Sequence, residues 1–204
     1  MYYLVFDLEM SGGEPGWHEI IQIGAILYDE NWNFLGDYLC NVCPENKEAF
    51  SRPAEEIHDL TWDELQNELL IDEVLEDFED WMLETMFANN EQERQRRALR
   101  NVVLCGQSVV NDIMFLKFAY KDCRMEWPFS YTQFDLFTLT FLVFRVLRKS
   151  GVSVPKSRSL GSVAEWLGFE RETTTHNALE DAEITAKCFK ALMVRFADKM
   201  QIGS

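Results

Sequence analysis

The sequence predicts an α/β fold in which a mixed sheet of five strands is flanked by helices. Three apolar segments rich in β-forming residues follow one another near the start, and helical patterns dominate from about residue 54 onward. Three successive strands before a run of helices indicate a mixed sheet that begins with hairpins. With 204 residues, 47% of them hydrophobic, and no repeat or linker, residues 1–204 are expected to form a single domain.

The expected strands are short apolar runs bounded by loop residues. "YYLVFDLE" (2–9) is apolar enough to be buried on both faces of a sheet. "EIIQIGAILYDE" (19–30) and "FLGDYLCNV" (34–42) are the second and third strands, joined by the turn-like "DENWN". "NVVLCGQS" (101–108) is a fourth strand ended by Gly106, and a short strand or helix entry is expected before residue 134.

The expected helices show apolar stripes and end signals. Thr61 with Glu64 has capping-box spacing, and "DEVLEDFEDWMLETM" (72–86) carries Val74, Phe78, Trp81 and Met82 on one stripe. "VNDIMFLKFAY" (110–120) has helical spacing, residues 134–148 form a core helix, and "SLGSVAEWLGF" (159–169) closes at Gly168. The last helix places these residues on one face: Ala178, Ala182, Ala186, Phe189, Leu192, Met193 and Phe196.

The bulk charge excludes a broad electrostatic grip on nucleic acid, because 35 acidic residues against 19 basic ones give a net charge of -16. A local basic groove, or acids clustered around divalent cations, remains compatible with it. "NNEQERQRRALR" (89–100) is either a solvated helix face or a substrate-facing arm, and its composition favours the first. Without a leader or a bilayer-spanning run, and with an odd set of five cysteines, a soluble cytoplasmic protein with reduced thiols and no membrane association is expected.

Four acidic residues and one histidine are the candidate site. Asp7 and Glu9 are two apart in a strand, so both side chains point to the same side. Two such carboxylates repel one another unless a divalent cation such as Mg²⁺ or Mn²⁺ lies between them. Asp112 opens a helix, and in "HNALEDAEITA" His176 precedes Asp181 by five positions. Taken separately, each feature is better explained as a solvated strand end or an ordinary helix start.

Together these motifs resemble the histidine-bearing branch (DEDDh) of the DEDD superfamily of 3′-to-5′ exonucleases. "FDLEMSG" looks like the first motif of that family, "GQSVVNDIMFL" like the second and "HNALEDAEITA" like the third. The first two look most like oligoribonuclease, and the third more like ribonuclease T and DNA polymerase proofreading subunits. Gln107, Ser108 and Asn111 depart from the His-Asn and Phe of most relatives. The resemblance, from about Tyr3 to Phe189, implies a ribonuclease H-like fold.

The resemblance also implies two-metal phosphodiester hydrolysis that releases nucleoside 5′-monophosphates from single-stranded RNA or DNA 3′ ends. Two ions, Mg²⁺ or Mn²⁺, are implied, with Asp7 bridging both, Glu9 and Asp181 completing the first, and Asp112 serving the second. His176 is implied as the general base. A helix turns about 100° per residue, so His176 is expected on the loop before the helix that carries Asp181.

Beyond the metal ligands, the resemblance implies that Met10 and Ser11 border the 3′-terminal nucleotide, with Met10 as an apolar wedge. Of the other histidines, His18 is expected to face solvent or substrate and His58 to pack at a helix entry. Asp122 and Asp135 are expected to be structural. Relatives are often dimers, so a homodimer is left open. A non-catalytic nucleic-acid-binding or adaptor domain, and a phosphodiesterase acting on a small nucleotide signal, are the alternative functions.

Overall fold

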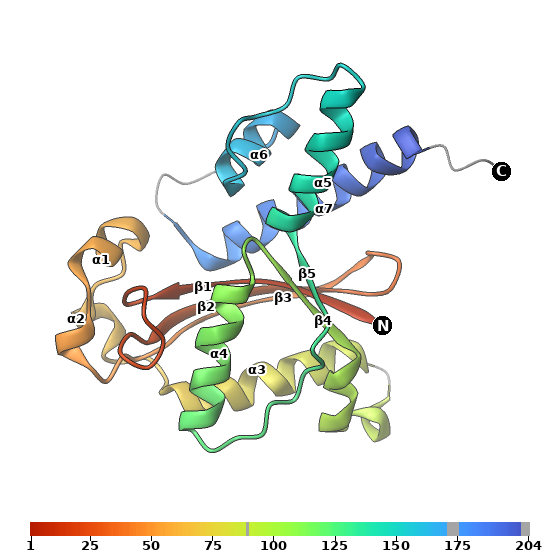
Figure 1. The fold of residues 1–204 in the computed structure, drawn as a ribbon. Coiled ribbons are helices and arrows are strands. Elements are labelled where there is room, and N and C mark those ends of the chain that lie inside the picture. The colour runs from red at the N-terminus through yellow and green to blue at the C-terminus, as the bar shows by residue number, and fades with distance from the viewer. Residues whose placement is uncertain (89, 171–175, 201–204) are drawn as a thin grey trace.

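The computed structural model describes residues 1–88, 90–170 and 176–200, the last six of them by backbone alone. The chain forms one five-stranded sheet in the order β3-β2-β1-β4-β5 (Figure 1). β2 pairs antiparallel with both β1 and β3, whereas β4 pairs in parallel with both β1 and β5, so the expected mixed sheet is confirmed. The strands are β1 Tyr2–Met10, β2 Ile20–Tyr28, β3 Phe34–Asn41, β4 Val102–Gly106 and β5 Gln133–Asp135.

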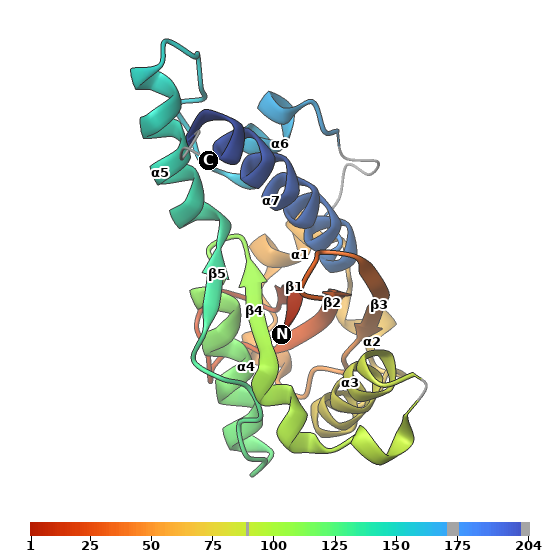
Figure 2. The same cartoon turned by 90° about the vertical axis from the view of Figure 1, so that its right-hand side faces the viewer.

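Helices cover both faces of the sheet. The α-helices are α1 Arg52–His58, α2 Trp62–Leu65, α3 Ile71–Met86, α4 Val110–Asp122, α5 Leu136–Lys149, α6 Leu160–Leu167 and α7 Ala178–Met200. Three short 3₁₀ turns complete the described chain: η1 Lys47–Ala49, η2 Glu91–Glu93 and η3 Arg96–Asn101. α3 and α4 lie on one face, and α5, α6 and α7 lie on the other (Figure 1, Figure 2).

β1 is the central strand, and its alternating side chains divide the molecule into two cores. Leu4, Phe6 and Leu8 pack with residues of α3 and α4, whereas Val5 packs with residues of α5, α6 and α7. The strand is therefore buried on both faces, as its nearly unbroken apolar run predicts. The odd-numbered residues that follow Val5 point to the face that α7 covers.

Most local end signals are confirmed at the residues where they were predicted. The amide of Glu64 donates to the Thr61 hydroxyl while the Glu64 carboxylate accepts from the Thr61 amide, which completes the capping box. The helix that it starts is a single turn, α2. Gly168 ends α6 with a left-handed φ of 87°, the conformation that glycine adopts most easily at a helix end.

The helices α5 and α7 differ in how well their predicted buried faces agree with the structure. α5 was expected to be a core helix, but only one side of it is buried, while Phe137, Phe141 and Leu142 are solvent-exposed on the other. In α7, the predicted apolar face is buried from Ala178 to Leu192. The side chain of Phe196 lies outside the described residues.

The arginine-rich segment is not an α-helix, and two of its arginines are held by other parts of the chain. Its described part folds into η2 and η3, and the Arg96 guanidinium pairs with the buried Glu79 carboxylate at 2.6 Å and also donates to the Glu126 carbonyl. Arg94 donates to the Phe87 carbonyl. η3 leads directly into Val102, which pairs with Tyr2 at the start of β1. This segment therefore lies at the opposite end of β1 from Glu9.

All five cysteines are free thiols, as expected. None of the helices in the described part of the chain combines the length and the apolar character that crossing a bilayer requires.

Candidate active site

The end of β1 carries the first two candidate acids. Asp7 and Glu9 share the face of β1 that α7 covers, and Glu9 is only 8% exposed. In the sheet, Asp7 lies opposite Gly24 and Glu9 lies opposite Gln22. Gly24 and Gln22 interrupt the apolar run of β2, and both of them position α7.

Gly24 and Gln22 hold the start of α7 directly on the sheet. A Cβ atom at Gly24 would lie 2.1 Å from the carbonyl carbon of Ala178 and from the amide nitrogen of Leu179, so only glycine permits this approach. The Gln22 side-chain carbonyl accepts the Ala178 amide at 2.9 Å, while its amide group donates to Asn41. The first turn of α7 is thereby fixed beside Glu9.

Asn177 caps α7 and places Asp181 one turn inside it. Its side-chain oxygen accepts from the amides of Leu179 and Glu180, and its carbonyl accepts from the amide of Asp181. The Asp181 side chain is 5% exposed. Asparagine is a preferred N-cap residue, so Asn177 carried a local signal for the start of α7. The role of Gln22 had no such signal, because it depends on contact with a distant segment of the chain.

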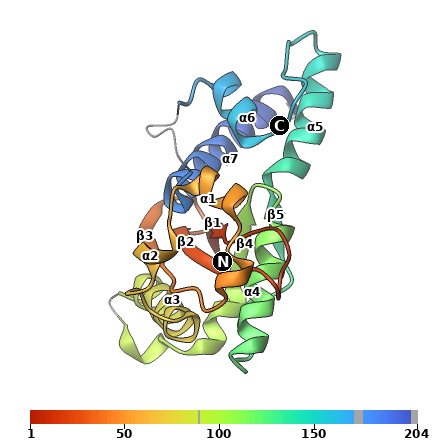
Figure 3. The same ribbon diagram turned by 90° about the vertical axis from the view of Figure 1, so that its left-hand side faces the viewer.

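His176 lies on the loop immediately before α7, as predicted, and its amide donates to the Ile57 carbonyl at the end of α1. Figure 3 shows α1 beside the beginning of α7. The Nδ1 atom of His176 lies 3.1 Å from Oδ2 of Asp181, and the histidine side chain is 44% exposed. His176 therefore reaches a buried acid while remaining open to solvent.

Glu9, His176 and Asp181 form a group that fits a metal ion. Each offers one ligand atom, and these three atoms lie within 4.8 Å of one another. Among the residues that the structure describes, this is the one such group of His, Cys, Asp or Glu side chains. It joins the first and third motifs, which are more than 160 residues apart in the sequence.

Asp112 approaches the same strand from α4. It is 6% exposed, and the backbone of Leu8, the residue between Asp7 and Glu9, is near enough to act on its pKa. Burial raises the pKa of Asp112 to about 7, and the nearby Asp135 carboxylate also raises it, whereas the backbone amides oppose the rise. Asp135 is the N-cap of α5 and accepts the amide of Val109 at 3.2 Å. Its structural role agrees with expectation, although its closeness to Asp112 was not anticipated.

The acids brought to β1 need positive charge. Glu9 and Asp181 are both buried and offer ligand atoms within 4.8 Å of each other, and buried carboxylates this close are costly to ionise together. Their oxygen atoms are the ligands that Mg²⁺ and Mn²⁺ prefer. The residues present therefore fit a divalent cation.

Two cavities border this site, and His58 lines both. One of about 310 Å³ is lined by Glu9, Met10, Ile57 and His58, among others, and the other of about 430 Å³ by His58 and His176. His58 is the last residue of α1, so its expected place at a helix entry is wrong, although it is buried as expected. Burial lowers its pKa, and the nearby His176 lowers it further. The sequence carried no signal that His58 would lie near His176.

Met10 and Ser11 differ in what they offer to a ligand. Met10 lines the smaller of these cavities with its apolar side chain. Ser11 is fully buried, its hydroxyl accepts the Glu19 amide at 2.9 Å, and its backbone carbonyl accepts the Ser51 amide. Ser11 therefore stabilises the turn that follows Met10.

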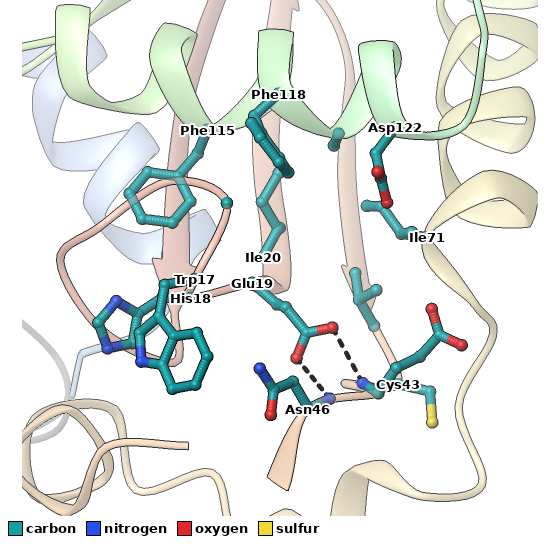
Figure 4. A pocket seen from close by; sticks show the side chains of 14 residues that line it. Trp17, His18, Glu19, Ile20, Cys43, Asn46, Ile71, Phe115, Phe118 and Asp122 are labelled. Atoms are coloured by element: carbon teal, nitrogen blue, oxygen red, sulfur yellow. Dashed lines mark hydrogen bonds between the residues drawn. The ribbon is translucent and has the colours of Figure 1, made fainter. Parts of the chain in front are cut away.

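His18 packs against the turn that follows Met10, and a third cavity lies near it. The ring of His18 fills the space beside Gly12, where an added Cβ would lie 2.1 Å from its Cδ2, and Nδ1 accepts the Glu14 amide. A cavity of about 150 Å³ lies between this loop and α4, with Glu19 accepting the amides of Glu45 and Asn46 on its floor (Figure 4). None of the candidate acids of the motifs lines it. His18 thus has a structural contact that sequence reasoning did not expect.

Comparisons with known proteins agree with this geometry. The family model for the RNase T type, described as exonuclease, matches residues 4–189. The DNA polymerase III PolC-type proteins of Thermotoga petrophila and Thermotoga maritima are each 28% identical to this chain over 200 residues. That match covers 98% of this chain but 12% of either polymerase, so the chain spans about an eighth of the length of these relatives.

Solved structures share the fold. Exonuclease I of E. coli in complex with a dT13 oligonucleotide has a TM-score of 0.76 at 17% identity, covering 98% of this chain and 42% of that one. The nuclease domain of 3′hExo, described as a DEDDh family member bound to rAMP, has a TM-score of 0.72 at 18% identity, covering 100% of this chain and 96% of its own. The expected ribonuclease H-like fold is confirmed.

Proposed function

Because this chain belongs to the exonuclease family whose model spans its residues 4–189, we propose that it hydrolyses single-stranded nucleic acid from the 3′ end and releases nucleoside 5′-monophosphates. The observation that carries this proposal is the group formed by Glu9, His176 and Asp181, with the buried Asp112 near the same strand. A domain that only binds nucleic acid has no need of buried acids around a solvent-open histidine.

The acids of the site are proposed to hold two divalent cations, Mg²⁺ or Mn²⁺. Bound there, the ions supply the Lewis acidity that activates water and stabilises the leaving 3′ oxygen. Asp7, Glu9 and Asp181 would hold one ion, and Asp7 and Asp112 would hold the other. Burial of Asp112 and Asp181 excludes bulk water from these carboxylates, which strengthens their attraction for a cation.

His176 is proposed to take the proton from the attacking water. Its place on the loop before α7 leaves the ring open to solvent on one side, while Asp181 fixes it on the other through Nδ1. A carboxylate bound to one nitrogen leaves Nε2 to accept a proton, which is the arrangement that a histidine base requires. His58 is buried nearby, and positive charge on His176 lowers the pKa of His58.

The cavity between the end of β1 and α1 is proposed to hold the base of the 3′-terminal nucleotide. Met10 contacts the base there, and Ile57 and Ala54 form the apolar wall of α1 opposite to it. Ser11 contributes by keeping Met10 in place. An apolar slot of this kind does not distinguish one base from another, so hydrolysis is expected on all four.

Labelled strands test this proposal. We expect 5′-labelled RNA or DNA with Mg²⁺ or Mn²⁺ to give a ladder that shortens from the 3′ end, and a 3′-phosphate to block it. Both sugars belong in the assay, because the similar structures were solved with either dT13 or rAMP. Asp7→Asn is the matched control for a contaminating nuclease. Cutting of a circular single strand would contradict the proposal, and hydrolysis of dinucleotides alone would favour a small-nucleotide phosphodiesterase.

A further inference from the structure

One long stretch of this acidic chain contains basic residues and no acidic ones. Between Leu136 and Ala164 the sequence contains no aspartate or glutamate, and it contains these cations: Arg145, Arg148, Lys149, Lys156 and Arg158. The whole chain carries a net charge of -16. This stretch comprises α5, the loop after it and the first part of α6, so its positive charge lies on one part of the surface.

The same stretch exposes aromatic rings. Phe137 and Phe141 are one turn apart on α5 and are 37% and 55% exposed, on the side opposite the buried Val143 and Leu147. The Arg158 guanidinium lies 3.8 Å from the centre of the Phe137 ring and 5.3 Å from that of Phe141. With the exposed Leu142 beside them, these rings give α5 a group of neighbouring exposed apolar side chains, and contiguous patches of this kind mark contact surfaces.

This surface begins beside the candidate active site. The N-cap of α5 is Asp135, which accepts the Val109 amide and acts on the pKa of Asp112. The Gln107 side chain donates to the Arg158 carbonyl at 2.9 Å, and Arg158 donates to the Phe137 carbonyl at 3.0 Å. Hydrogen bonds thus connect the end of β4, the Arg158 loop and the first turn of α5, and α5 then extends away from the sheet (Figure 1, Figure 2).

We propose that the exposed face of α5 together with Arg158, hereafter the α5 platform, binds the single strand upstream of the nucleotide being removed. This inference rests on the proposed function. Bases stack on Phe137 and Phe141 while the cations contact phosphates, the combination by which proteins bind single strands without reading sequence. From Phe137 to Arg148 the helix rises about 16 Å, room for up to about five phosphates at the 3.4 Å spacing of a stacked strand.

Charge complementarity is what identifies nucleic acid as the occupant. A surface that receives another protein domain through its aromatic rings does not require a stretch of chain from which every acid is absent. An overall charge of -16 repels a polyanion, so a nuclease of this composition needs a local positive path to hold more than the terminal nucleotide.

The test compares two lengths of strand in three variants. Phe141→Ala removes a stacking ring, and Arg145→Ser with Lys149→Ser removes two exposed cations. Arg97→Ser with Arg100→Ser is the matched control, since it makes the same charge change at exposed residues near the opposite end of β1. The substrates are dT2, too short to reach Phe141, and dT12, with rU2 and rU12 as the RNA pair. All measurements use the full chain with Mn²⁺.

We expect Phe141→Ala to lower kcat/KM on the 12-mer about fivefold or more and to leave the dinucleotide unchanged. The double cation variant should lower kcat/KM on the 12-mer as well, and should reduce its log–log salt dependence by about 1.4, which is 0.7 per lost contact on a single strand. The control variant should behave as wild type on both lengths.

Wild-type activity separates failure of this inference from failure of the proposed function. If wild type hydrolyses neither length, the proposed function fails. If wild type hydrolyses both and the platform variants match the control on the 12-mer, the α5 platform does not bind the strand, and its exposed rings belong to a protein contact.

Discussion

His176 and Asp181 lie 3.1 Å apart but are proposed to do different work, and single substitutions distinguish them. Asp181→Ala removes a metal ligand, so Mn²⁺ binding and turnover should be lost together. His176→Ala removes a group that acts on water, so Mn²⁺ binding should remain while kcat falls roughly 10²–10⁴-fold. Calorimetry with Mn²⁺ and single-turnover kinetics at saturating metal measure the two effects.

The pH profile gives the control for this pair of variants. A histidine base is active only when neutral, so wild-type kcat should rise with pH through the neutral range, and His176→Ala should lose that rise. Equal loss of Mn²⁺ binding in both variants would make His176 a metal ligand. Near-normal turnover of His176→Ala would refute its assignment as the base.

Asp112 predicts a pH dependence of stability in the metal-free protein. Its pKa is about 7 in the folded chain and 3.8 in the reference state, because burial disfavours the carboxylate. The folded state therefore holds this proton more tightly, and the stability it contributes below pH 4 is lost as the pH rises to about 7. Asp112→Asn, which stays neutral, should raise the melting temperature by several degrees at pH 8 in EDTA, and hardly at pH 4.

The metal arm of the same experiment separates function from folding. Added Mn²⁺ should raise the melting temperature of the wild type at pH 8 more than that of Asp112→Asn, because binding to the native state stabilises it. If Asp112→Asn and the wild type melt at the same temperature at pH 8 in EDTA, the pKa of Asp112 is not raised in the folded protein.

At the scale of elements, the position of α7 on β2 decides whether the ligands meet. Gly24→Ala places a methyl group 2.1 Å from backbone atoms of Ala178 and Leu179, so the start of α7 must move away from Glu9. We expect this variant to lose several-fold or more of its Mn²⁺ affinity although it changes no ligand. Melting curves in EDTA and Mn²⁺ titration measure its stability and its affinity.

Gly161→Ala is the control for Gly24→Ala. Gly161 lies inside α6 with open space where the Cβ would stand, so alanine should stabilise the protein by about 0.5–1 kcal/mol and leave Mn²⁺ binding unchanged. Unaltered Mn²⁺ affinity in Gly24→Ala would show that α7 tolerates the displacement and that its seating on β2 does not set the site.

At the scale of the whole molecule, both hydrophobic cores share β1 and β4, because the two faces of one sheet line them. We therefore propose that residues 1–204 form a single domain and predict that the metal-free chain unfolds in one transition. Calorimetry should give equal calorimetric and van't Hoff enthalpies. Two resolved transitions would instead assign α5, α6 and α7 to a unit that unfolds separately from α3 and α4.

The sequence by itself determined the order and type of most elements, because each depends on local chemistry. The apolar run of β1, the capping box at Thr61 and the glycine that ends α6 act within a few residues. It also determined the candidate acids, since three motifs in order identify them without any knowledge of distance. The 3₁₀ turns of the arginine-rich segment were not predicted, and Arg96 there contacts Glu79 and Glu126, which lie outside it.

Only the tertiary structure decided which of these residues meet. Gln22 and Gly24 seat α7 beside Glu9, His58 packs near His176, and Asp135 acts on Asp112, each across a separation of more than 20 residues. The sequence also predicted α5 as a core helix, whereas packing buries one side of it and leaves Phe137 and Phe141 exposed. Local patterns record how apolar a segment is. Which of its faces is covered depends on segments far away in the chain, and that is set only when the sheet and both helical layers assemble.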